Sequence, residues 1–276
     1  MPLVILLLTG CASVSKDAMN VPRFVDGPGG KLWIDDGGRG GVPVIFVHGN
    51  GASSSQWSAQ LAHLRMHRRS IAFDLRGMGH SDPAANGDYS VSAVSGDIGA
   101  VADALGIRRF VLVGHSYGGA IVGAYAAAHP DRIAGLVFVD SAGDLRGTAE
   151  AGAAKFDAAL RSAKGDAVIE AWFAPLLEPS TEAVQQQVLA SAKATDREVF
   201  IAALQSLRSY DPILLRDRYR GPELIVARQA ETSGSLQSIY GDVPVKLVSG
   251  SGHWIMLDQP EELNAILDGF LAGIRE

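Results

Sequence analysis

The stretch Phe110-Val-Leu-Val-Gly114-His115-Ser116-Tyr117-Gly118-Gly119 decides the fold of this chain. It begins as an apolar, β-rich run, passes through the pattern Gly-x-Ser-x-Gly, and continues into small residues that suit a helix from Tyr117 to His129. Glycine on both sides of the serine permits a strand-to-helix turn so tight that the hydroxyl stays exposed. The next backbone N–H then lies at a helix N-terminus, where it favours developing negative charge. The pattern therefore predicts that Ser116 is a nucleophile.

On either side of this turn, apolar runs rich in β-branched residues alternate with helical patterns. Most of the runs are apolar throughout, as in strands that are buried on both faces of a parallel sheet. The alternation predicts the α/β class, with a mostly parallel twisted sheet flanked by helices. The expected strands are Lys31–Ile34 at an edge, Val42–Val47, Ser70–Phe73, Phe110–Val113, Gly135–Val139, Glu223–Ala227 and Val243–Val248.

One stretch, Ser141 to Gly221, interrupts the alternation with amphipathic helical patterns and no convincing strand. It is too long for a simple connection and lies between two strands, so we expect an inserted helical cap above the sheet. The expected cap helices are Ala151–Ser162, Asp166–Phe173, Thr181–Ala192 and Asp196–Ser209. The expected domains are thus a core of residues 21–140 and 222–276 and a cap of residues 141–221, after a leader of residues 1–20.

Composition excludes several classes of protein. The chain has 276 residues, of which 47% are hydrophobic and 20% charged, so it is not a disordered chain. Its 24 Lys and Arg against 30 Asp and Glu give a net charge of −6, and without a basic excess we expect no nucleic-acid partner. A single cysteine excludes an internal disulfide framework and a cysteine-rich metal site.

The motifs together resemble those of the α/β-hydrolase family, and the resemblance runs from about Lys31 to Ile274. Besides the serine motif, His48-Gly49-Asn50-Gly51 follows an expected strand, and Asp74-Leu-Arg-Gly-Met-Gly-His-Ser81 matches a structural loop of the family. The resemblance implies an oxyanion hole made by the backbone N–H groups of Asn50 and Tyr117, which would stabilise charge in the transition state.

Serine is a weak nucleophile at neutral pH and needs a base within hydrogen-bonding reach. His253 follows the last expected strand, where the family's order of serine, acid and histidine places the base. We expect His48 and His115 to pack beside the motifs. We expect His63 and His67, four residues apart, to lie on a solvated helix face rather than to bind a metal.

Two carboxylates compete to be the acid that orients this base. Glu231, after the strand Glu223–Ala227, aligns with the family's usual Gly-x-x-Asp position, although Arg228 replaces the turn glycine and glutamate replaces aspartate. Asp140 ends the strand Gly135–Val139, where some members of the family carry the acid. Both positions satisfy the geometry in principle, and we place Glu231 ahead of Asp140.

These residues predict a cofactor-independent serine hydrolase that cleaves a small carboxylic ester through an acyl-enzyme on Ser116. We expect no metal and no organic cofactor, because neither a P-loop nor a dinucleotide fingerprint is present. Apolar residues of the cap predict an enclosed, mostly apolar pocket. The alternatives are a C–C bond hydrolase or lactonase of the same fold, and a non-catalytic ligand-binding lipoprotein.

The first residues favour an exported protein. The apolar run Leu3–Leu8 is too short to span a bilayer, and Leu8-Thr9-Gly10-Cys11 resembles a bacterial lipobox, although no Lys or Arg precedes the run. This predicts a protein of the bacterial cell envelope, lipid-anchored at Cys11 or periplasmic, whose only membrane contact is that anchor. If the segment is not a signal, the protein is expected in the cytoplasm.

Replacing the lone cysteine tests the anchor. Cys11→Ser is expected to move the protein from the membrane fraction of a bacterial host to the soluble fraction, because the acceptor of the lipid is lost. Immunoblotting of the two fractions measures this. A wild-type protein that is already soluble contradicts the lipoprotein hypothesis.

Overall fold

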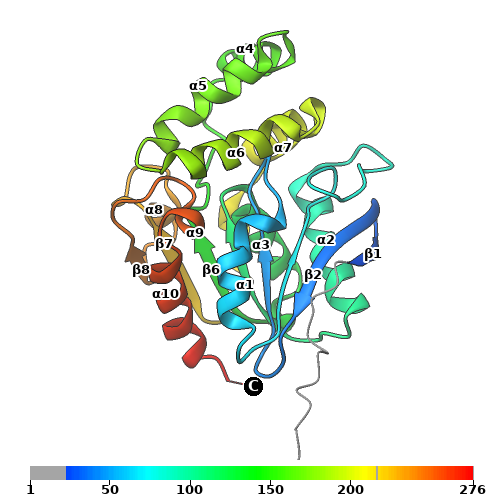
Figure 1. Ribbon diagram of the computed structural model, residues 1–276, viewed down its shortest axis with the longest axis vertical. Helices are drawn as coiled ribbons and strands as arrows, with labels where there is room; N and C mark the ends of the chain where they lie inside the picture. Colours follow the sequence, from blue (N-terminus) through cyan, green and yellow to red (C-terminus); the bar gives the residue numbers. More distant parts are fainter. Residues whose placement is uncertain (1–22, 216, 276) are drawn as a thin grey trace, which may run out of the picture.

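The computed structural model describes residues 23–215 and 217–275. Its centre is one eight-stranded sheet with the strand order β1-β2-β4-β3-β5-β6-β7-β8 (Figure 1). Strands β3 to β8 are parallel, and β2 pairs antiparallel with both β1 and β4. The expected fold class is confirmed. The strands are β1 (Arg23–Gly27), β2 (Gly30–Gly37), β3 (Val44–Val47), β4 (Ser70–Phe73), β5 (Phe110–His115), β6 (Ile133–Val139), β7 (Glu223–Ala227) and β8 (Val245–Leu247).

Helices cover both faces of the sheet, and the strands supply apolar side chains to each. Along β5, Phe110 and Leu112 face one hydrophobic core, whereas Val111 and Val113 face the other. Helices α2 (Val91–Ala104) and α3 (Tyr117–Ala128) complete the first core. Helices α1 (Ser58–Leu64) and α10 (Pro260–Ala272) complete the second, and the short helices α8 (Leu236–Ile239) and α9 (Ile255–Asp258) lie in loops after β7 and β8. This double burial explains why the strands are continuously apolar.

Strand β1 escapes prediction because its sequence carries little hydrophobic signal. Its residues Arg23, Phe24 and Asp26 are exposed, and it pairs only with β2 at the edge of the sheet. Val25 packs against the first hydrophobic core, and backbone hydrogen bonds to β2 hold the rest of the strand.

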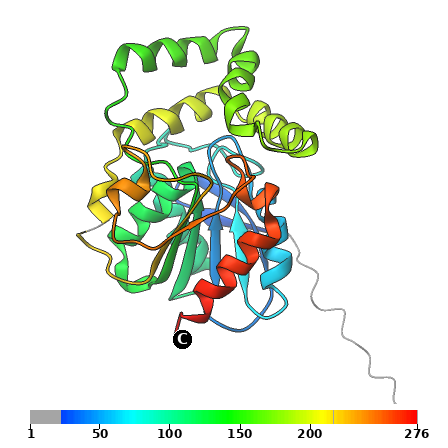
Figure 2. The same cartoon turned by 90° about the vertical axis from the view of Figure 1, so that its left-hand side faces the viewer.

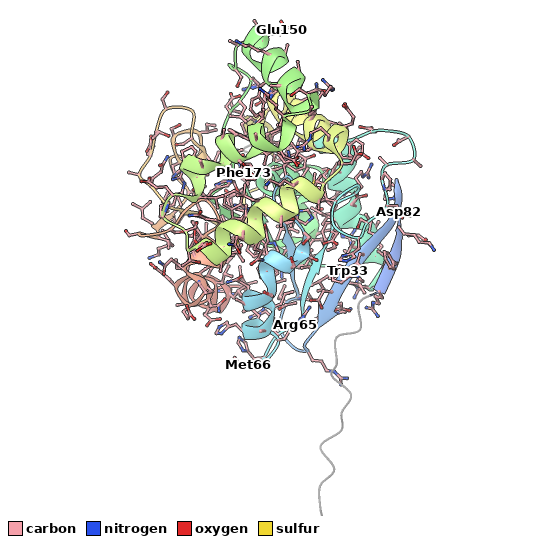
Figure 3. The ribbon with its side chains drawn as sticks, turned by 45° about the horizontal axis from the view of Figure 1, so that its top comes forward. Trp33, Arg65, Met66, Asp82, Glu150 and Phe173 are labelled. Atoms are coloured by element: carbon pink, nitrogen blue, oxygen red, sulfur yellow. The ribbon has the colours of Figure 1, made fainter. Side chains whose placement is uncertain are left out.

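Four helices lie between β6 and β7 and arch over one end of the sheet (Figures 1 and 2). They are α4 (Glu150–Arg161), α5 (Gly165–Leu177), α6 (Glu182–Ala194) and α7 (Arg197–Ser209). Phe173 of α5, labelled in Figure 3, is 4% exposed, and its ring centroid lies 5.1 Å from that of Trp254 in the core. The hydrophobic core of this cap is therefore continuous with one core of the sheet.

The loop after β4 is stabilised by a buried ion pair. Arg76 donates from Nη2 to Asp97 Oδ1 over 2.6 Å and from Nε to Asp97 Oδ2 over 2.8 Å. Asp74 accepts the backbone N–H groups of Ser54 and His80. These contacts give the Asp-x-Arg-Gly loop the structural role expected for it.

Residues 1–20, expected to form a leader with Cys11 as its lipidation site, lie outside the described residues. Within residues 23–215 and 217–275, no helix is long and apolar enough to cross a membrane.

Two glycines give a matched test of the packing of α3. A Cβ on Gly118 would lie 2.5 Å from the backbone oxygens of Val47 and His48, whereas a Cβ on Gly96 of α2 would meet nothing within 4 Å. We expect Gly118→Ala to lower the free energy of unfolding by about 1–3 kcal/mol through overpacking. Gly96→Ala is expected to raise it by about 0.5–1 kcal/mol through helix propensity. Urea titrations of the two variants measure both changes. Equal effects on the free energy of unfolding would contradict the close packing of α3 against the residues after β3.

Candidate active site

Ser116 lies in the turn between β5 and α3 with backbone angles φ 53° and ψ −119°. A non-glycine residue in this region is strained and persists only where its surroundings hold it. Here the Ser116 N–H donates to the Val139 carbonyl of β6 over 3.2 Å, and the Ser116 carbonyl accepts from Gly119 N–H over 2.9 Å. The turn therefore holds Ser116, which is half-buried, in the strand-to-helix position that its sequence predicts.

The two residues expected to supply oxyanion donors lie on segments that flank this serine. Tyr117 is the first residue of α3, so its N–H is among the donors that a helix leaves without an intrahelical partner. The loop after β3 passes against the nucleophile, because a Cβ on Gly49 would lie 3.2 Å from Ser116 Cβ. Asn50 follows in this loop, and its side-chain Nδ2 donates to the Phe200 carbonyl of α7 over 3.0 Å.

The structure brings His253 together with Asp140 and not with Glu231. His253 Nδ1 lies 2.6 Å from Asp140 Oδ2, and the two side chains are 16% and 14% exposed. Glu231 is exposed, in the loop after β7. Of the two carboxylates weighed above, the one placed second has the hydrogen-bonding geometry of a triad acid. With Nδ1 occupied, Nε2 is the nitrogen of His253 that is free to serve Ser116.

Asp140 is ionised in this environment. Burial opposes its charge, but the hydrogen bond and charge of His253, together with the charge of Arg228, outweigh burial and lower the pKa of Asp140 below its ordinary value. The Arg228 Nε donates to Asp140 Oδ2 over 3.1 Å. An ionised carboxylate in this position can orient the imidazole and stabilise its protonated form.

The two histidines expected to pack beside the motifs do so, with defined hydrogen bonds. His48 Nε2 accepts the Leu75 N–H over 2.9 Å, so that Nδ1 donates to the Gly49 carbonyl. His115 Nε2 donates to the backbone carbonyl of His253 over 2.9 Å, and the two rings lie 4.6 Å apart between centroids. Burial is the main cause that lowers the pKa of both His48 and His115, so both rings are neutral.

The loop that carries His253 is also bonded to the cap. The His253 N–H donates to the Leu176 carbonyl of α5 over 2.8 Å. Asp258 Oδ2 accepts the Gly252 N–H over 2.8 Å and the Ser180 hydroxyl over 2.9 Å. Nothing in the sequence marked the two contacts with the cap, because each joins residues about 80 positions apart that share no motif.

A cavity of about 330 Å³ opens beside the serine and histidine. Ser116, His253, residues 140–145 and residues 228–230, 232–235 and 237 line it. The expectation of an enclosed, mostly apolar pocket is not met at this cavity, whose walls are loops after β6 and β7 with polar and apolar surface in similar amounts. Residues 141–145 of the expected cap line it, but the cap helices do not. The apolar cap side chains pack instead on one another and on Trp254.

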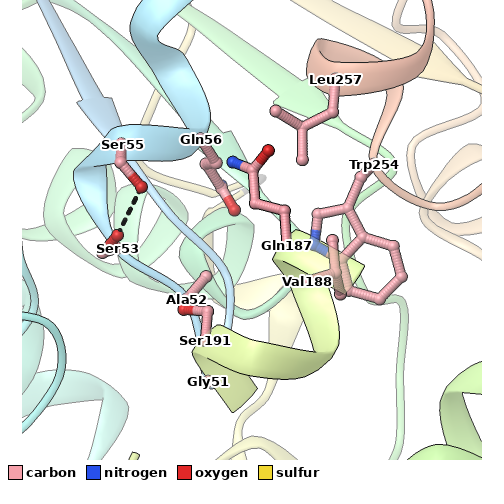
Figure 4. Close-up of a pocket in the computed structure, with 10 residues that line it drawn as sticks. All are labelled: Gly51, Ala52, Ser53, Ser55, Gln56, Gln187, Val188, Ser191, Trp254 and Leu257. Carbon is pink, nitrogen blue, oxygen red and sulfur yellow. Dashed lines mark hydrogen bonds between the residues drawn. The ribbon is translucent and has the colours of Figure 1, made fainter. Parts of the chain in front are cut away.

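A second hollow lies between residues 51–56, α6 and Trp254 (Figure 4). Its volume of about 20 Å³ suits a single water molecule and is too small for a substrate. The cavity of about 330 Å³ is the candidate substrate site because Ser116 and His253 both line it.

The histidine pair on α1 and the turn after it faces the C-terminal helix. His63 Nε2 lies 2.8 Å from Asp268 Oδ2, and His67 Nε2 lies 3.9 Å from Asp268 Oδ1. Within the described part of the chain, no group of three or more His, Cys, Asp or Glu side chains is arranged to hold a metal ion.

Comparisons with known proteins agree with this fold. A non-heme chloroperoxidase from Streptomyces lividans is 39% identical over 112 residues, 40% of this chain and 40% of that protein. A 2-hydroxymuconate semialdehyde hydrolase from Pseudomonas sp. (strain CF600) is 33% identical over 131 residues, 46% of each. The chain thus matches less than half of the length of these curated relatives.

Similarity to solved structures extends over nearly the whole chain. The esterase RhEst1 from Rhodococcus sp. ECU1013 has a TM-score of 0.77 and 25% sequence identity, covering 92% of this chain and 99% of that one. Residues 42–210 match the family described as the alpha/beta hydrolase fold. This match spans more than half of the chain and includes the serine turn, and the chain belongs to the alpha/beta hydrolase fold family.

Proposed function

We propose that this protein is a cofactor-independent serine hydrolase that cleaves a small carboxylic ester through an acyl-enzyme on Ser116. The observation that carries the proposal is the 2.6 Å contact between His253 Nδ1 and Asp140 Oδ2 at a cavity that Ser116 also lines. A nucleophile, a base and an acid that orients the base are the groups that this chemistry requires.

The reaction would proceed in two halves. Ser116 Oγ attacks the ester carbonyl carbon while His253 Nε2 takes the hydroxyl proton, and the same nitrogen then protonates the departing alcohol. In the second half water attacks the acyl carbon while His253 Nε2 takes its proton. The bond from that carbon to Ser116 Oγ then breaks, His253 returns the proton to Oγ, and the carboxylic acid leaves. Asp140 stays ionised throughout and stabilises the imidazolium that forms in both halves.

The backbone donors of Asn50 and Tyr117 are proposed to hold the oxyanion of each tetrahedral intermediate. A preset donor of this kind is worth about 3–4 kcal/mol in the transition state, because it need not reorganise as charge develops. The close approach of Gly49 to Ser116 supports the placement of Asn50 beside the reacting carbonyl.

The cavity supports a small substrate with polar groups. Its volume of about 330 Å³ is at the lower end of the range for small-molecule sites. Its lining includes Ser141, Thr232 and Ser233, which offer hydrogen bonds to polar atoms of the acyl or alcohol part. The solved relative RhEst1 is itself named an esterase, which supports ester cleavage here.

Removal of the nucleophile tests the mechanism. Ser116→Ala is expected to lower kcat for a p-nitrophenyl ester by about 10⁴-fold or more, because no other group forms the acyl-enzyme. The melting temperature should not fall, since the side chain lies on a turn and not in a core. Unchanged turnover by the purified variant would eliminate Ser116 as the nucleophile. Turnover of lactones or C–C substrates alone would favour the alternative of a lactonase or C–C bond hydrolase over ester cleavage.

A matched pair of amides separates the two candidate acids. Asp140→Asn is expected to lower kcat about 10³- to 10⁴-fold, because the amide favours the wrong tautomer of His253. Glu231→Gln, at an exposed position, should leave kcat within a factor of about two. Steady-state kinetics on one ester compare them, and the reverse ranking would restore Glu231 as the acid.

A further inference from the structure

We propose that Arg228 is a positioning residue that holds Asp140 for His253 and whose charge sets the lowest pH at which His253 works as the base. The inference rests on the proposed serine hydrolase and adds to it a residue that lies outside the triad. It also gives a role to the arginine that replaces the family's turn glycine in this chain.

The first observation is that Arg228 donates hydrogen bonds to both carboxylate oxygens of Asp140. Its Nε donates to Asp140 Oδ2 over 3.1 Å, and its backbone N–H donates to Oδ1 over 3.4 Å. His253 Nδ1 bonds to the same Oδ2, so one carboxylate oxygen is shared between an imidazole and a guanidinium. Arg228 thus contacts both oxygens of the carboxylate, one of which also bonds to the imidazole.

The second observation is that Asp140 itself needs support. Its φ of 39° lies in the left-handed region, which is strained for a residue with a Cβ. The Asp140 N–H donates to the Val226 carbonyl of β7 over 2.7 Å. Because Arg228 follows two residues after Val226, the same strand end supplies the backbone and the side-chain contacts that hold the acid.

The third observation is burial, which makes the charge of Arg228 effective. The side chains of Arg228, Asp140 and His253 are 21%, 14% and 16% exposed. Charges in such positions are screened by solvent and salt much less than surface charges are. A guanidinium that neutralises part of the Asp140 charge therefore weakens the stabilisation of a protonated His253. Loss of this guanidinium is therefore expected to favour the protonated imidazole, which cannot take the serine proton.

Other charged and titratable groups around the pair do not replace Arg228. His115, which packs against the His253 ring, is neutral through burial. Asp144 lines the cavity but binds Arg146 Nε over 2.9 Å and Nη2 over 2.7 Å. Asp258 bonds to the Gly252 N–H and not to the imidazole, and Glu231 is exposed. Among the described residues, Arg228 is the cation that contacts Asp140.

Two substitutions separate the charge of Arg228 from its shape. Arg228→Gln removes the charge, and Arg228→Lys keeps it while losing the planar fork. Arg161→Gln is the matched control, because it removes an equal charge from an exposed pair with Glu198 on the cap. For each protein, the rate of Ser116 labelling by a fluorophosphonate and kcat/KM for a p-nitrophenyl ester are measured from about pH 5 to pH 9, around the ordinary range of histidine.

In both pH profiles the rate is expected to fall toward low pH as His253 becomes protonated, and we call this part of the curve the acid limb. Arg228→Gln is expected to move the acid limb to higher pH by about 1 unit, because loss of a nearby positive charge favours the protonated imidazole. The sign follows from the base, which must be neutral to act. Arg228→Lys is expected to keep the acid limb near its wild-type position but to lower the maximal rate at high pH, which we call the plateau. Arg161→Gln is expected to change neither the acid limb nor the plateau. A purely structural role for Arg228 would lower the plateau without moving the limb.

The proposal is overturned if the acid limb of Arg228→Gln stays in place, or if Arg228→Lys moves as far as Arg228→Gln. With either outcome, the proposed function still stands if the fluorophosphonate labels Ser116 of the wild-type protein and the wild-type protein hydrolyses the ester. A wild type that neither labels nor turns over overturns the proposed function and this inference with it. Because labelling needs no cognate substrate, a wild type that labels without turning over the ester still decides the role of Arg228.

Discussion

The site depends on the hydrogen bond from the Ser116 N–H to the Val139 carbonyl, which joins the carboxyl ends of β5 and β6. In the β5–β6 ladder His115 pairs with Val139, so Ser116 and Asp140 leave the sheet at the same level. Both residues have positive φ, which turns their side chains out of the line of the strands. The proposed nucleophile and the proposed acid are thus placed by one register between two parallel strands.

The next strand extends the same arrangement. Val139 pairs with Val226 in the β6–β7 ladder, which puts Arg228 one step beyond the strand end that faces Asp140. Carboxyl ends of parallel strands meet at one edge of a sheet, and loops there are free to carry chemistry without disturbing the core. Serine, aspartate and arginine therefore come together although 112 positions of chain separate the first from the last.

The cap is joined to this edge by more than apolar packing. The Leu176 carbonyl of α5 accepts the His253 N–H, and the Phe200 carbonyl of α7 accepts a side-chain N–H of Asn50. A Cβ on Gly51 would lie 2.5 Å from the Phe200 ring, so the loop after β3 fits closely under the cap. Two elements of the site, the histidine loop and the loop that carries Asn50, are thereby held from above as well as from the sheet.

By itself the sequence determined the sheet, the serine turn and the position of His253. These features follow from local constraints. Continuous apolar runs of strand length predict the sheet, glycines on both sides of Ser116 predict a tight turn, and His253 follows the last expected strand. The edge strand β1 was missed because an exposed strand has no hydrophobic period. Only the tertiary structure decided between Asp140 and Glu231 as the partner of His253, revealed the contact of Arg228, and showed that loops rather than cap helices line the cavity. Those features depend on strand register and on distances between segments far apart in the chain, which no local pattern records.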